Sequence, residues 1–113
     1  MKDPVKLYRA RGGGSAPVVL RRAQNDVHKF MAVFPDGKVV RFGRKGYSDY
    51  TLHKDPERMR RYITRHKKRE NWTRSGIRTS GWWARWLLWS KPNFSAALGQ
   101  TEKVLGRKIV YVK

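Results

Sequence analysis

The chain has 113 residues, of which 39% are hydrophobic, and this suits one small domain with a modest core. It carries 27 lysines and arginines against eight acidic residues, so its formal charge of +19 makes polyanions the expected partners: nucleic acid, an anionic membrane surface or an acidic protein surface. The absence of cysteine excludes disulfides and thiolate zinc sites, no run approaches the roughly 20 apolar residues of a spanning helix, and Met1 to Pro4 lack the apolar stretch of a signal peptide.

The first 17 residues have the composition of a basic, glycine-rich extended arm. Three consecutive glycines, Gly12 to Gly14, stabilise neither a helix nor a strand. A disordered tail would have the same composition. We expect residues 1–17 to thread along neighbouring molecules and residues 18–113 to form a single small α+β domain.

A β-hairpin is predicted next. Two β-prone runs, 28–33 and 38–42, flank Phe34-Pro35-Asp36-Gly37, in which proline presets its own φ and glycine accepts a positive one. Alternation places Phe30, Ala32 and Phe34 on one face, but it does not say which face is buried. The run from Pro17 to Arg21 also has strand character.

A basic helix is expected from Pro56 to about Glu70. Asp55 is suited to cap it, Pro56 to open it and Glu57 to complement its dipole. Its positive residues and those of the preceding glycine turn are candidates for contact with an anionic partner: Arg58, Arg60, Arg61, Arg65, Lys67, Lys68, Arg69, Arg44 and Lys45. Neutralisation of phosphates explains such a density well. No signature of base-specific recognition accompanies it.

A tryptophan-rich helix follows a connector that contains Trp72. Thr79 or Ser80 is suited to cap it, and Pro92 ends it or opens the next helix. At 100° per residue three faces carry apolar side chains, interrupted only by Arg85. The interpretations are a domain core, an interface to another protein or insertion at a membrane surface. The residues concerned are Trp72, Trp82, Trp83, Trp86, Trp89 and Arg85. Arg85 is expected to reach a carboxylate such as Glu70 or to point at the neighbour.

The C-terminal part is expected to form one more helix and a strand. Apolar residues repeat at helical spacing from Phe94 to Leu105, and Gly106 is suited to the position after the helix. Ile109 to Val112 fit a short closing strand that would pair with the hairpin.

Catalytic chemistry is not indicated. His28, His53 and His66 are well separated, and His53-Lys54-Asp55 places a histidine beside a carboxylate that helix capping already explains. A metal-dependent nuclease would need several convergent ligands. We therefore predict no catalytic, metal or cofactor-binding residues and no small-molecule substrate.

An ordered series of motifs resembles a family of small basic proteins, of unknown function, encoded by large nucleocytoplasmic DNA viruses. The resemblance spans His28 to Lys108 and is carried by Tyr47-Ser48-Asp49-Tyr50-Thr51, His53-Lys54-Asp55, Arg61-Tyr62-Ile63, Arg65-His66, Glu70-Asn71-Trp72, Ser75-Gly76, Gly81-Trp82-Trp83, Arg85-Trp86-Leu87-Leu88-Trp89 and Lys91-Pro92. It implies a viral origin and no catalytic role.

The sequence therefore predicts an α+β fold with an N-terminal β-hairpin, three helices and a short C-terminal strand. The expected function is structural: a minor capsid protein of a giant virus that binds the major capsid protein and other minor capsid proteins. It would reside in the virion capsid, and in the host cytoplasm during assembly. The alternative is a non-specific DNA-binding protein that packages the genome inside the virion. The basic surface could meet protein, DNA or the inner membrane surface.

Overall fold

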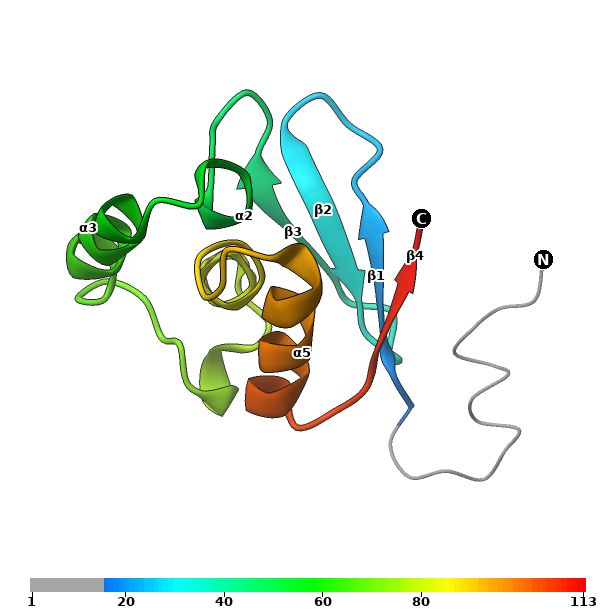
Figure 1. Ribbon diagram of the computed structural model, residues 1–113. Helices are drawn as coiled ribbons and strands as arrows, with labels where there is room; N and C mark the ends of the chain where they lie inside the picture. The colour runs from blue at the N-terminus through cyan, green and yellow to red at the C-terminus, as the bar shows by residue number, and fades with distance from the viewer. Residues whose placement is uncertain (1–15) are drawn as a thin grey trace.

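The structure, a computed structural model, describes residues 16–113, and the proposed arm lies almost wholly outside them. The described residues form a mixed α and β fold with one four-stranded sheet in the order β3-β2-β1-β4. The helices lie on one face of this sheet (Figure 1). The α+β prediction therefore holds in outline.

The hairpin is part of a larger sheet. β1 (Val18–Arg22), β2 (His28–Val33) and β3 (Val39–Arg44) pair in succession as antiparallel strands. The turn between β2 and β3 forms as expected, with Gly37 at φ 94° and its N–H donating to the carbonyl of Phe34 at 2.9 Å. Phe30, Ala32 and Phe34 are buried, so their face packs against the helices.

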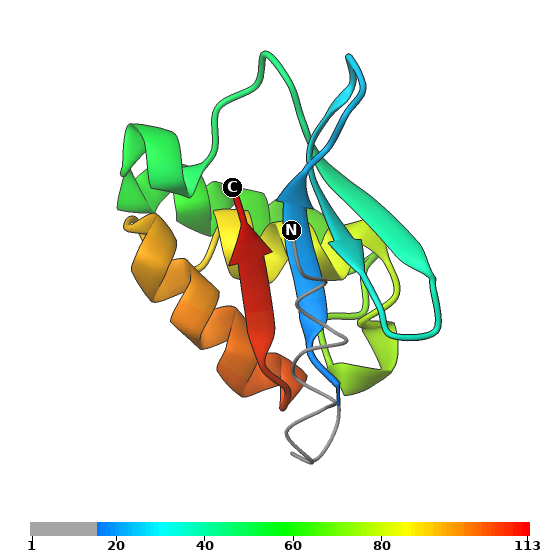
Figure 2. The same ribbon diagram turned by 90° about the vertical axis from the view of Figure 1, so that its right-hand side faces the viewer.

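β4 (Ile109–Val112) closes the sheet in a way that differs from expectation. It pairs in parallel with β1, with Val18 opposite Ile109, and does not pair with the hairpin of β2 and β3 (Figure 2). A parallel neighbour needs a long crossover connection, and the helices between β3 and β4 supply it. β1 therefore lies between the hairpin and the closing strand.

Four α-helices, a 3₁₀ turn and a π-helical turn follow β3. They are α2 (Tyr50–His53), α3 (Pro56–His66), the 3₁₀ turn η1 (Arg74–Gly76), α4 (Ser80–Trp83), the π-helical turn η2 (Ala84–Leu88) and α5 (Phe94–Leu105). The three expected helices are present, and α2 is an addition that Asp49 caps. α3 ends four residues before the predicted Glu70, because residues 67–69 form a turn.

The tryptophan segment, α4 with η2, lies in the core. Trp82, Trp83, Leu87 and Leu88 are at most 2% exposed. Trp83 packs on Phe34 and Phe42 of the sheet, with ring centroids 6.1 and 5.7 Å apart. A π turn holds more residues per turn than an α-helix, so the faces from Ala84 onward rotate away from those of a 100° plot.

The opposite face of the sheet is aliphatic. The strand registers place six apolar side chains there with Arg21 and Arg41: Val19, Met31, Val33, Val39, Val110 and Val112. No described helix covers this face (Figures 1 and 2). Within residues 16–113 no helix is both long and apolar enough to cross a membrane.

Candidate functional site

α3 presents a dense group of exposed positive charges. Its exposed cations, with those of the following turn, are Arg58, Arg60, Arg61, Arg65, Lys67, Lys68 and Arg69. Among the described residues only Arg60 of this set has an acidic partner, Glu57, at 3.0 Å. Three of them, Arg58, Arg61 and Arg65, form what we call the arginine row: they follow the i, i+3, i+7 spacing of one helix face and rise about 10 Å along it.

The local sequence explains why a helix forms despite this charge. Asp55 accepts hydrogen bonds from the backbone N–H groups of Glu57 (2.9 Å) and Arg58 (3.5 Å). Pro56 occupies the first turn, Glu57 lies at the positive end of the helix dipole, and Arg65 with His66 lies at the negative end. These end effects offset part of the repulsion among the arginines.

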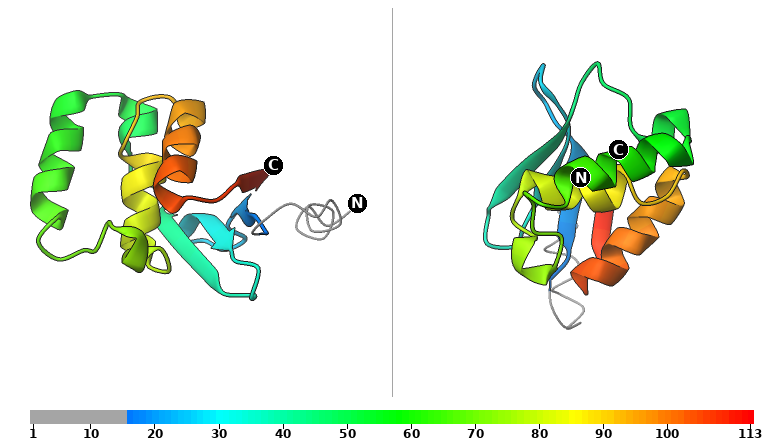
Figure 3. Two further views of the ribbon diagram at one scale, coloured as in Figure 1. Left: turned by 90° about the horizontal axis from the view of Figure 1, so that it is seen from below. Right: turned by 90° about the vertical axis from the view of Figure 1, so that its left-hand side faces the viewer.

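A stack of aromatic rings holds α3 to the body of the protein. Tyr62 is the one buried residue of α3, and its ring lies parallel to that of Trp89, with centroids 4.2 Å apart and 1° between the planes. His66 stacks on Tyr62 at 4.2 Å. Burial, followed by the nearby Glu70 carboxylate, raises the pKa of Tyr62, so it stays a neutral phenol. Figure 3 shows α3 on the side of the molecule away from β4, joined through the tryptophan segment.

Arg85 reinforces this attachment in a way that the sequence did not predict. It donates from Nη1 to the carbonyl of Trp89 at 2.9 Å, rather than to Glu70. Its guanidinium lies 4.5 Å from the ring of Trp86 and 5.4 Å from that of Trp72. Burial lowers the pKa of Arg85, and the two ring faces supply part of the lost solvation.

The predicted tryptophan set therefore divides in two. Trp82 and Trp83 have no exposed surface and are core residues. Trp72, Trp86 and Trp89 are half-buried, and their remaining surface is all that stays available for the interface predicted from the sequence.

Most carboxylates of the described residues pair with a positive side chain of the protein or cap a helix. Asp36 pairs with Arg78 at 2.5 Å, Asp49 with Lys29 at 2.7 Å, Glu70 with His66 at 2.8 Å and Glu102 with Lys108 at 3.4 Å. The backbone N–H of Lys38, followed by the Arg78 side chain, lowers the pKa of Asp36. Asp55 and Glu57 serve α3. Within residues 16–113 this leaves only the exposed Asp26 outside these roles.

The glycine turn after β3 lies beside α3. A hollow of about 310 Å³ is lined by Arg44 and Tyr47 on one side and by Arg65 and His66 on the other. Arg44 lies 5.3 Å from the centroid of the Tyr47 ring. The structure therefore joins Arg44 to the arginine row of α3. The Lys45 ammonium, in contrast, donates to the carbonyl of Asn25 at 2.6 Å.

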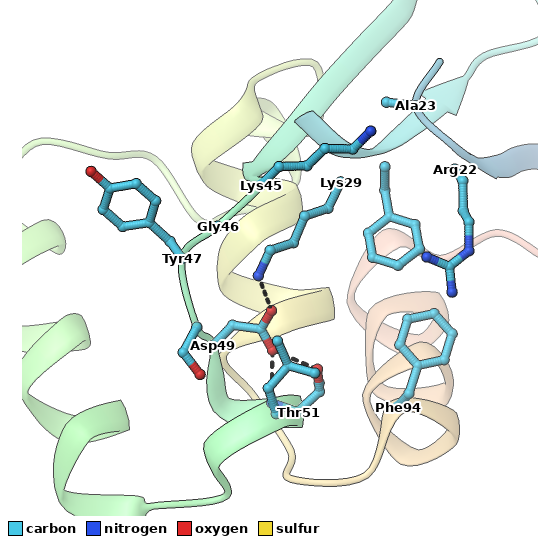
Figure 4. A pocket seen from close by; sticks show the side chains of 12 residues that line it. Arg22, Ala23, Lys29, Lys45, Gly46, Tyr47, Asp49, Thr51 and Phe94 are labelled. Atoms are coloured by element: carbon cyan, nitrogen blue, oxygen red, sulfur yellow. Dashed lines mark hydrogen bonds and ion pairs between the residues drawn. The ribbon is translucent and has the colours of Figure 1, made fainter. Parts of the chain in front are cut away.

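A second hollow, of about 730 Å³, opens on the other side of this turn (Figure 4). Arg22, Lys29, Lys45, Tyr47 and Phe94 are among its lining residues. Arg22 and Phe94 were not predicted as site residues, because sequence distance hides that β1 and α5 meet here. Tyr47 could have been predicted, since an aromatic residue stands two positions after Lys45 in the same glycine turn.

His53 and Asp55, which are close together in the sequence, have structural roles. His53 Nδ1 accepts the backbone N–H of Asp55 at 2.9 Å, while the Asp55 carboxylate caps α3. Burial, followed by the charge of Arg58, lowers the pKa of His53. No group of three potential metal ligands occurs within residues 16–113.

The class defined by these observations is a small mixed α and β protein with a projecting basic helix. A family model, described as a family of unknown function (DUF5754), matches residues 18–66, which is less than half of the chain. The matched segment runs from the start of β1 to the end of α3, so it includes the arginine row and leaves out the tryptophan segment. No curated protein and no solved structure gave a match.

Proposed function

We propose that this protein binds the phosphate backbone of nucleic acid without reading base sequence. The observation that carries the proposal is the arginine row of α3, which is exposed and lacks acidic partners among the described residues. Phosphate neutralisation with release of counterions is the principal source of sequence-independent affinity. A guanidinium also matches phosphate geometrically through paired N–H donors.

The placement of the row supports this choice over an acidic protein patch. α3 projects from the body and buries only Tyr62, so its charged side is accessible along its length (Figure 3). Arg44 extends the positive surface past the end of α3. A projecting cationic rod of this kind can follow a groove or a strand of phosphates, whereas a folded acidic partner would need a matching cleft.

The experiment is titration of the full chain against a labelled duplex of mixed sequence between about 50 and 300 mM salt. The test variant replaces Arg58, Arg61 and Arg65 by glutamine. The matched control replaces Lys38, Lys103 and Lys113, three exposed lysines away from α3, by glutamine. Both variants lose the same formal charge.

The wild type is expected to bind duplexes of different sequence equally, with affinity falling steeply as salt rises. The α3 variant should make the slope of log affinity against log salt shallower by about 2 to 3, close to one unit per lost phosphate contact. The control should change it by less than about 1. Equal losses in the two variants, or no binding by the wild type at physiological salt, would remove the proposal.

A structural role in the virion is the second candidate, and the sheet face that no described helix covers favours it. Six aliphatic side chains on that face, with Arg21 and Arg41, have the composition of a protein contact. In this role the protein would be a minor capsid protein among capsid subunits. Mass spectrometry of gently stripped particles distinguishes the two candidates: recovery in the capsid shell supports this role, and recovery with the genome core supports the first.

A further inference from the structure

The surface around Tyr47 combines exposed apolar groups with positive charge, and the arginine row alone does not explain it. Tyr47 and Leu52 are each 63% exposed, and both line the 730 Å³ hollow. Phosphate binding needs neither side chain. A partner that also carries planar apolar groups would use both.

The floor of the hollow is aromatic. The rings of Phe30 and Phe94 stack with centroids 5.6 Å apart and 23° between their planes. The Arg22 guanidinium lies 5.8 Å from the centre of the Phe30 ring. Phe94 is half-buried, so part of its ring remains open to a ligand.

The charges around the hollow are divided between structure and binding. Lys29 is neutralised by Asp49, whose other oxygen accepts the backbone N–H of Thr51 at 2.9 Å and its hydroxyl at 2.5 Å. Asp49 is 2% exposed and holds the turn that carries Tyr47. Arg22 and Lys45 have no acidic partner among the described residues, and they keep the rim positive.

Tyr47 lies between two hollows. It lines both the 730 Å³ hollow and the 310 Å³ hollow beside Arg65, and Arg44 packs on its ring. We call the surface at Tyr47, between the two hollows, the ridge. The phosphates of a single strand that crosses it would contact Arg65, then Arg44, and then Lys45 and Arg22. Its unpaired bases would meet the rings of Tyr47 and Phe94.

We propose that this ridge and hollow bind single-stranded nucleic acid by stacking unpaired bases on Tyr47 and Phe94, and this inference rests on the proposed phosphate binding. The bases of a duplex are stacked on one another and cannot enter. Aromatic stacking is tolerant of base identity because every base has a π-face. The ligand class is therefore single-stranded DNA or RNA of any sequence.

The test compares three labelled ligands of equal phosphate number: a thymidine oligomer of about 12 nucleotides, an abasic oligomer and a duplex. Tyr47→Leu removes the ring and keeps an apolar side chain, while Tyr47→Phe keeps the ring. Tyr47 is exposed, so neither change should disturb folding.

The wild type is expected to bind the thymidine oligomer about 10-fold more tightly than the abasic one. Tyr47→Leu should reduce this ratio to about 3-fold or less without changing duplex affinity, and Tyr47→Phe should preserve it. Equal affinity for the thymidine and abasic oligomers in the wild type overturns the stacking inference, and so does an equal loss for all three ligands in Tyr47→Leu. If duplex binding persists in those cases, the proposed function stands. If none of the three ligands binds, both proposals fall together.

Discussion

α3 and the tryptophan segment are neighbours in the fold, but one exposes charged side chains and the other buries apolar ones. The tryptophan segment buries four large side chains and packs against the sheet on one side and against α5 on another. α3 buries Tyr62 alone, and together with the turn that follows it leaves seven cations in solvent. Burial of apolar surface stabilises the tryptophan segment, whereas a stack of aromatic rings and helix capping stabilise α3. The contrast separates the part that stabilises the protein from the part that is free to bind.

The largest expected effect lies in the tryptophan segment. Trp83→Ala removes a fully buried indole from between Phe34 and Phe42 and should lower the free energy of unfolding by about 3 to 5 kcal/mol. Its Nε1 donor to the carbonyl of Ile77, at 2.7 Å, is lost as well. Denaturant unfolding followed by circular dichroism measures the change. Trp83→Phe should cost clearly less, and equal costs would contradict the packing described here.

The next effect should be confined to α3. Tyr62→Ala removes the ring between Trp89 and His66 and should cost about 2 to 3 kcal/mol, somewhat below a fully enclosed aromatic residue. Hydrogen exchange should show lost protection for 56–66, with the amides of the tryptophan segment still protected. Thr64→Ala, which removes an exposed hydroxyl and methyl of the same helix, serves as the control. Uniform loss of protection across the chain would mean that α3 is integral to the core.

A smaller effect of opposite sign is expected from the arginine row. Replacing Arg58, Arg61 and Arg65 by glutamine removes like-charge repulsion at i, i+3 and i, i+4 spacing and should stabilise the protein by about 0.5 kcal/mol at low salt. The gain should shrink as salt rises, because exposed charges are screened. Thermal unfolding at two salt concentrations measures it. A destabilised variant would show that these arginines have structural partners.

The smallest effect concerns pH. The pKa of His53 is lowered in the fold, so its neutral form contributes stability that is present above the ordinary value of about 6.5 and is lost as pH falls below it. His53→Asn retains an acceptor for the Asp55 N–H and does not titrate. The stability difference between wild type and variant should therefore decrease between about pH 7 and pH 5. A constant difference would contradict the shift.

The sequence was informative wherever the signal was local. The turn at Pro35 to Gly37, the cap at Asp55 and the end of α5 at Gly106 depend on residues within a few positions, and each forms as predicted. The cap of α4 is Thr79, one of the two residues predicted for it. The density of positive charge in the sequence was also enough to identify the cations of α3 as candidates for contact with an anionic partner.

The remainder depends on contacts between distant residues. Nothing in Ile109 to Val112 reveals that β1 and not the hairpin is its neighbour. The π turn at Ala84 to Leu88 rotates the side chains from Ala84 onward, and a regular helical plot contains no such turn. The meeting of Arg22, Tyr47 and Phe94 around one hollow joins three segments whose proximity only the fold creates.

The commitment of nearly every described carboxylate to an internal partner has a thermodynamic consequence. The folded protein holds few counter-charges of its own for its cations, so a bound polyanion would supply them, and binding would be linked to folding. A non-nucleotide polyanion such as inorganic polyphosphate should then raise the melting temperature, with a gain that grows with its concentration. The free protein would then be less stable than its complex with a polyanion, and its melting temperature would depend on the polyanion concentration.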